Sequence, residues 1–134
     1  MTAGLAYLDT SAYVKLPLRE SEGASLLGEL AEYGGYVSSA LLGVEAVRAC
    51  ARYGERYAEQ ARAWLLDVVL LPVDDSLLDE ATTVDPAGLR SLDAIHLATA
   101  LSIRDDLGAF FTYDERLRQA AADHRLPVCP PFRR

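Results

Sequence analysis

The sequence predicts an α/β protein with a three-layer α/β/α sandwich, in which a central, mostly parallel sheet lies between two layers of helices. Short apolar runs alternate with longer segments of helical pattern, as they do where crossover helices connect parallel strands. The apolar runs at 5–8 and 109–112 show no polar alternation, which is typical of strands that are buried on both faces.

The expected strands are short apolar runs bounded by turn residues, acids or proline, and they lie at 5–8, 36–39, 68–73, 109–112 and 126–128. Asp9 directly follows the first of these runs, and Pro72 stands at the far end of the third. The fourth run ends at Tyr113 and Asp114, so that two of the five strands lead straight into an aspartate.

The expected helices are the periodic segments between helix breakers, and they cover 11–16, 21–33, 40–53, 55–66, 75–84, 91–103 and 115–124. Pro17 ends the first helix, the Gly34–Gly35 pair closes the second, and Gly54 stops the third. Ser91 is a favoured N-cap residue and predicts the start of the helix at 91–103, which meets no Gly or Pro before Gly108.

The helix at 91–103 is apolar or small on nearly every side, which is the pattern of a helix buried inside a domain. Asp93 lies in its first turn, where an unpaired buried carboxylate would cost several kcal/mol. Taken alone, Asp93 is explained by its favourable position at the positive end of the helix dipole. Three further acids in comparable places weaken that explanation.

Length and composition predict a single domain over residues 1–134, because the chain is long enough for one hydrophobic core. No apolar run approaches the roughly 18 residues of a membrane span, and no basic residue precedes the first apolar stretch. Cys50 and Cys129 fit neither a metal-binding spacing nor a disulfide framework. We therefore expect free thiols in a cytoplasmic protein that has no membrane association.

The net charge of −7 argues against a protein that grips nucleic acid by bulk electrostatic attraction. It permits an enzyme that meets phosphate groups through bound cations. The sequence also contains no aromatic platform and no basic stripe that would indicate a particular nucleic acid.

Four acids occupy related positions in four separate segments: Asp9, Glu45, Asp93 and Asp114. Asp9 and Asp114 follow strands, whereas Glu45 and Asp93 lie in the early turns of helices that begin at the same sheet edge. Ligand sites of open parallel sheets lie beyond the carboxyl ends of the strands. We therefore expect all four carboxylates to converge there.

Converging carboxylates repel one another and require a cation or shared protons. A set of oxygen ligands suits Mg²⁺ or Mn²⁺, whereas zinc would favour His or Cys. Such ions polarise phosphoryl groups and activate water, so the pattern predicts phosphodiester hydrolysis. Thr10, Ser11 and Thr112 are candidates either for orienting ligands or phosphate or for capping the adjacent elements.

The segments that carry these acids read Leu-Asp-Thr-Ser-Ala at 8–12, Val-Glu at 44–45, Leu-Arg-Ser-Leu-Asp-Ala-Ile-His-Leu at 89–97 and Phe-Thr-Tyr-Asp at 111–114. Together, in this order and spacing, they resemble the PIN-domain ribonucleases, and most of all the VapC toxins of bacterial toxin–antitoxin pairs. The resemblance covers nearly the whole chain and departs from the family pattern at none of the four acids.

This resemblance implies a PIN-like α/β/α fold and a metal-dependent endoribonuclease that cleaves RNA as the toxin of a type II pair. It implies that Asp9, Glu45, Asp93 and Asp114 are the catalytic residues and bind Mg²⁺ or Mn²⁺. It further implies a homodimer and a cognate antitoxin that inserts a segment, often with a basic residue, into the acidic groove.

Two other functions fit this sequence less well. A non-catalytic interaction module of the same fold predicts lost acids, but all four are present. A haloacid-type phosphatase would place a second Asp two positions after Asp9, where Ser11 stands, and a receiver domain would place an acidic pair near the end of the first strand, where 6–8 is Ala-Tyr-Leu. The nuclease is therefore favoured.

The sequence leaves two possible roles open for each of three further residues. His96 is read as a hydrogen-bonded core residue or a support for the site in preference to a general base. Arg90 either contacts substrate phosphate or pairs with the acids, and Lys15 is either solvated or a phosphate contact.

Overall fold

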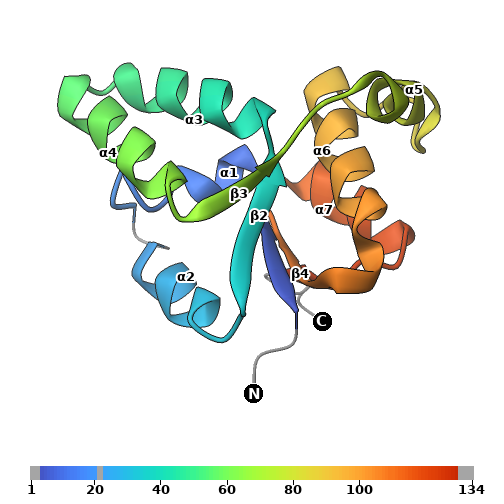
Figure 1. The fold of residues 1–134 in the computed structure, drawn as a ribbon, viewed down its shortest axis with the longest axis horizontal. Coiled ribbons are helices and arrows are strands. Elements are labelled where there is room, and N and C mark those ends of the chain that lie inside the picture. Colours follow the sequence, from blue (N-terminus) through green and yellow to red (C-terminus); the bar gives the residue numbers. More distant parts are fainter. Residues whose placement is uncertain (1–3, 21–22, 130–134) are drawn as a thin grey trace.

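The computed structural model describes residues 4–20 and 23–129 and has a parallel sheet between two helical layers (Figure 1). The strands of the described residues are β1 (Leu5–Leu8), β2 (Gly35–Ser39), β3 (Val68–Leu71), β4 (Leu107–Phe111) and β5 (Val128–Cys129). They pair in the order β3-β2-β1-β4-β5, and every pairing is parallel. The predicted α/β/α architecture is confirmed.

The helices of the described residues are α1 (Thr10–Tyr13), α2 (Gly23–Leu30), α3 (Leu41–Ala51), α4 (Glu55–Leu65), α5 (Asp75–Thr83), α6 (Ser91–Ser102) and α7 (Glu115–Asp123). A short 3₁₀ turn, Arg104–Asp106, joins α6 to β4. Figure 1 shows α1 to α4 on one side of the sheet and α5 to α7 on the other. No helix among 4–20 and 23–129 combines the length and apolarity that crossing a membrane requires.

Two hydrophobic clusters fill the spaces between the sheet and its helical layers, because successive side chains of each strand face opposite sides. Ala6 and Leu8 of β1 face the cluster that contains α1 to α4. Tyr7, between them in sequence, faces the other cluster together with Phe110 of β4 and Leu97 of α6. The central strand β1 is therefore covered on both faces.

The strand boundaries differ from the sequence prediction by one or two residues in several strands. β3 ends at Leu71 and not at 73, and β4 covers Leu107–Phe111 and not 109–112. β5 was expected at 126–128 but begins at Val128, since Pro127 has no N–H with which to donate to the ladder. The Pro127 carbonyl instead accepts from the Phe110 N–H at 2.8 Å. The start expected for the second helix, residues 21–22, lies outside the described residues.

The start of α6 is a second difference, because Ser91 is not its N-cap. Arg90 holds the N-cap position with an extended backbone (φ −62°, ψ 149°), and Ser91 is the first helical residue. The Arg90 side chain makes no capping hydrogen bond. The helix is also less enclosed than expected: Leu92 is 48% exposed, whereas Ala94 and the run 96–100 are buried.

Candidate active site

The four predicted acids lie at the carboxyl-end edge of the sheet, around its three inner strands β2, β1 and β4. Asp9 follows β1 directly and caps α1, and Asp114 lies beyond β4 and caps α7. Glu45 lies in the second turn of α3, and Asp93 in the first turn of α6. Strand order reverses between β1 and β4, and this is the place where open α/β sheets bind ligands.

The Asp9 carboxylate is buried, with 3% of the residue exposed, and is held by several donors. The Ala12 N–H donates to Oδ1 at 2.9 Å, which closes the helix cap. The Ser11 hydroxyl lies 2.8 and 2.9 Å from the two carboxylate oxygens, and the Thr112 hydroxyl donates to Oδ2 at 2.6 Å. These contacts fix the carboxylate between the β1–α1 and β4–α7 junctions.

The hydroxyls of Ser11 and Thr112 also bind the segment that leads to Asp114. The Tyr113 N–H donates to Ser11 Oγ at 2.8 Å, and the Asp114 N–H donates to Thr112 Oγ1 at 3.1 Å. Asp9 and Asp114 therefore share Thr112 as a partner. The sequence left two roles open for these hydroxyls, orienting ligands or phosphate and capping adjacent elements. In the structure Ser11 and Thr112 both contact Asp9, one of the candidate ligands.

Arg90 joins two further acids. Its Nε lies 3.3 Å from Asp93 Oδ2, and its Nη2 donates to Asp114 Oδ2 at 3.0 Å. The side chain of Arg90 is 71% exposed, so these ion pairs are largely accessible to solvent. The sequence left open whether Arg90 contacts substrate phosphate or pairs with the acids. In the structure it pairs with the acids.

Glu45 is held from a different direction. Its Oε1 accepts from the Thr10 hydroxyl at 2.8 Å and from His96 Nε2 at 2.9 Å. Thr10 is adjacent to Asp9 in sequence, and His96 follows Asp93 by one helical turn. Glu45 therefore joins the other acids through their neighbours and not by direct contact.

The pKa values of three of these acids are shifted by burial, by nearby charges and by hydrogen bonds. Burial raises the pKa of Asp9, although hydrogen bonds from Thr112, Ala12 and Ser11 oppose the shift. Burial and the nearby Asp114 also raise the pKa of Asp93, against the attraction of Arg90. Burial pushes the pKa of Glu45 upward, but hydrogen bonds from His96 and Thr10 outweigh it and leave that pKa below its usual value.

The donor chemistry of this edge fits a hard divalent cation, because its acids, one buried and three partly buried, carry carboxylate oxygens as ligands. Among residues 4–20 and 23–129, however, no three His, Cys, Asp or Glu side chains are grouped closely enough to hold a metal ion. The guanidinium of Arg90 instead supplies positive charge to Asp93 and Asp114. The four acids are therefore linked through hydrogen bonds and Arg90 at one edge, and the expected convergence of all four carboxylates on one cation stays a prediction.

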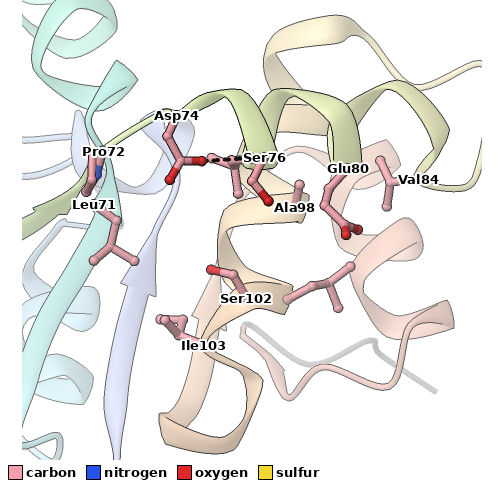
Figure 2. A pocket seen from close by; sticks show the side chains of 11 residues that line it. Leu71, Pro72, Asp74, Ser76, Glu80, Val84, Ala98, Ser102 and Ile103 are labelled. Carbon is pink, nitrogen blue, oxygen red and sulfur yellow. Dashed lines mark hydrogen bonds between the residues drawn. The ribbon is translucent and has the colours of Figure 1, made fainter.

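Figure 2 shows a cavity elsewhere in the molecule, between the end of β3, α5 and α6. Its volume is about 510 Å³, and it is lined by apolar side chains such as Leu77 and Ile103 together with Asp74 and Glu80. None of the four acids lines this cavity. Asp74 caps α5 by accepting from the Leu77 N–H at 2.9 Å, so its role there is structural.

The structure also decides the sequence interpretations of Lys15 and of the two cysteines, and it adds one residue that the sequence did not indicate. Lys15 lies 2.8 Å from Glu20 and 4.9 Å from the centre of the Tyr113 ring, so it is engaged by protein groups and not simply solvated. Cys50 and Cys129 are both free thiols, as predicted. Tyr7 was not identified from the sequence, although its hydroxyl lies 2.7 Å from His96 Nδ1.

Comparison with known proteins identifies the family. A sequence model described as the PIN domain matches residues 6–123, which includes all four acids. This chain belongs to the PIN-domain family.

Several curated relatives are ribonucleases of Mycobacterium tuberculosis. The PIN-domain chain is 45% identical to Ribonuclease VapC46 over 125 residues, covering 93% of this chain and 96% of that protein. It is 42% identical to Ribonuclease VapC47 over 118 residues, covering 84% and 87%. The resemblance to VapC proteins inferred from the sequence is confirmed.

A solved structure agrees on the fold. The crystal structure of Mycobacterium tuberculosis VapC20, described as a sarcin–ricin-loop cleaving toxin, superimposes with a TM-score of 0.71. The match covers 86% of this chain and 94% of VapC20 at 19% sequence identity. It therefore supports the PIN-like sandwich alone.

The raised pKa of Asp93 leads to a test of stability. An acid with a raised pKa destabilises the fold while ionised, and this penalty disappears as the pH falls through the folded-state pKa. In EDTA at neutral pH, Asp93→Asn is expected to melt at a higher temperature than the wild type. The difference should shrink as the pH falls towards the ordinary pKa of aspartate, measured by circular dichroism.

Asp79→Asn on the exposed face of α5 is the matched control, because it changes the net charge equally without touching the edge. Adding Mg²⁺ should raise the wild-type melting temperature and narrow the gap to Asp93→Asn, since a ligand of the folded state stabilises it. If Asp93→Asn melts lower than the wild type in EDTA and Mg²⁺ has no effect, the acids do not form a common site.

Proposed function

We propose that this PIN-domain protein is a Mg²⁺- or Mn²⁺-dependent endoribonuclease and the toxin of a type II toxin–antitoxin pair. The observation that carries the proposal is the linked network of Asp9, Glu45, Asp93 and Asp114 at one sheet edge. The identity of 45% to a protein named a ribonuclease supports RNA as the substrate. A cytoplasmic location agrees with the free thiols and stays part of the proposal.

In the proposed mechanism the four acids would hold one or two divalent cations, which would supply the positive charge that polarises a phosphodiester and activates water. Asp9 is oriented before any ligand arrives, because Ser11, Thr112 and the Ala12 N–H fix it. Thr10 and His96 orient Glu45 in the same way.

Asp93 and Asp114 complete the proposed ligand set from α6 and from the start of α7. Their partner Arg90 is mostly exposed, so its ion pairs are of the kind that contributes little stability, about 0–1 kcal/mol. The guanidinium can therefore turn towards the phosphate of a bound RNA at small cost. Arg90 is assigned this substrate-binding role beside its pairing with the acids.

The carboxylates at the sheet edge also indicate which protein partner would bind there. The carboxylates at the edge favour a cationic ligand, and an antitoxin segment with Arg or Lys would satisfy them as Arg90 does. We assign inhibition to such a segment, which excludes both cation and substrate. The proposed assembly also includes a homodimer, as the resemblance to VapC toxins implies.

Purified protein is expected to cut RNA in Mg²⁺ or Mn²⁺ and to stop when EDTA is added. Asp9→Asn and Asp93→Asn should each lower the cleavage rate by more than about 100-fold, because losing an outer partner of a metal ligand alone typically costs 10–100-fold. The assay is a gel of labelled RNA, with Asp79→Asn as the variant that should keep its activity. Undiminished cleavage in EDTA, or by either site variant, contradicts the metal mechanism.

Expression of the wild type in a bacterium is expected to stop growth, whereas Asp93→Asn should be tolerated. Co-expression of the proposed cognate antitoxin should restore growth, because its basic segment would occupy the acidic edge. The measurements are growth curves and recovery of a stable complex from the co-expressing cells. If the wild type cuts RNA in vitro but leaves growth unchanged, the toxin assignment fails and the nuclease assignment stands.

A further inference from the structure

A chain of hydrogen bonds runs from the interior of the fold to the acidic edge. The Tyr7 hydroxyl lies 2.7 Å from His96 Nδ1, and His96 Nε2 lies 2.9 Å from Glu45 Oε1. Tyr7 is on the central strand β1, His96 on α6 and Glu45 on α3. Three elements are therefore joined by side chains alone.

The proton positions along this chain follow from the chemistry of its ends. The Tyr7 hydroxyl can both donate and accept a hydrogen bond. A carboxylate oxygen only accepts, so the contact between His96 Nε2 and Glu45 Oε1 is a hydrogen bond donated by the imidazole. In the tautomer with its proton on Nε2, His96 has a lone pair on Nδ1, to which the Tyr7 hydroxyl at 2.7 Å can donate.

Packing fixes the imidazole as firmly as the hydrogen bonds do. His96 is 1% exposed and Tyr7 is fully buried. The Tyr7 ring stacks on Phe110 at 5.0 Å with an interplanar angle of 12°, and it meets the His96 ring edge-on at 5.8 Å and 88°. Rings locked in this way have one orientation, and Nε2 therefore points to one place.

The final contact connects the two helical layers. α3 packs with α1 and α4 on one face of the sheet, and α6 lies on the other (Figure 1). The bond from His96 to Glu45 passes between these layers beyond the end of β1. Within the described part of the chain, the hydrogen bonds to Glu45 end on Oε1, from His96 and from Thr10, so Oε2 is left for a ligand.

We propose that Tyr7 and His96 are positioning residues of the nuclease: they hold the Glu45 carboxylate in the orientation that binds the cation, and they act through Glu45 without touching RNA. This inference rests on the proposed function of the four acids. It differs from a merely structural role for a buried histidine, because it ties the Tyr7 hydroxyl to the behaviour of Glu45.

The test uses three variants of the chain and one matched control. Tyr7→Phe removes only the hydroxyl and keeps the stacked ring. His96→Leu removes the donor to Glu45, and His96→Gln retains a side-chain N–H₂ as a donor. Tyr13→Phe is the control, because Tyr13 is equally buried and its hydroxyl donates at 2.6 Å to the Ala61 carbonyl, away from Glu45.

Two quantities are measured on each purified variant: the affinity for Mn²⁺ alone by titration calorimetry, and kcat and KM on a fluorescent RNA. His96→Leu should weaken Mn²⁺ binding by about 10–100-fold and lower kcat while KM for RNA stays constant. Tyr7→Phe should show a smaller loss in the same direction, and His96→Gln should recover part of it. Tyr13→Phe should lower the melting temperature as Tyr7→Phe does but keep the wild-type Mn²⁺ affinity and kcat.

The outcomes separate this inference from the function on which it rests. If the wild type binds Mn²⁺ and cuts RNA while Tyr7→Phe matches Tyr13→Phe in both measurements, the positioning role is wrong and the nuclease assignment stands. If the wild type neither binds Mn²⁺ nor cuts RNA, the proposed function fails and takes this inference with it. Tyr7→Phe keeps the aromatic core, so the test holds even where His96→Leu does not fold.

Discussion

The burial of the Asp9 carboxylate is the constraint on which the working edge of the sheet depends. A carboxylate removed from water must be satisfied by hydrogen bonds or its charge becomes costly. Asp9 meets this requirement with one backbone donor and two hydroxyls, from Ser11 and Thr112. These hydroxyls in turn accept from the backbone that leads to Asp114. The geometry of the second acid is thus tied to the first.

The other three acids also repel one another, and different side chains stabilise them. Asp93 and Asp114 share the Arg90 guanidinium, whereas Glu45 has a hydroxyl and an imidazole on one oxygen. Each acid is therefore stabilised by groups that lie close in space, although some of them are distant in the sequence, as His96 is from Glu45. The side chains of Asp93 and Glu45 nevertheless stay 18% and 21% exposed, so both can be reached by a ligand from solvent.

Much of the fold was predictable because apolar runs and helix breakers punctuate this sequence clearly. The strands and helices were placed within a few residues, and the errors have local causes. Because Pro127 has no N–H, β5 begins only at Val128. Because the backbone is extended at Arg90, Arg90 is the N-cap and Ser91 is the first helical residue. Both boundaries depend on the backbone conformation of the residues just before the element, which the sequence alone does not give.

The candidate site was predictable only as a set of positions. Asp9, Asp74 and Asp114 all follow strands and cap helices in this structure, and a sequence reading has little to distinguish them. Strand order makes the difference: β3 is the edge strand, so Asp74 lies away from the β1–β4 junction where strand order reverses. Tyr7 escaped notice for a related reason, since a tyrosine in an apolar strand is usually core. Only the partner of its hydroxyl, contributed by a helix 89 positions later, reveals a connection to Glu45.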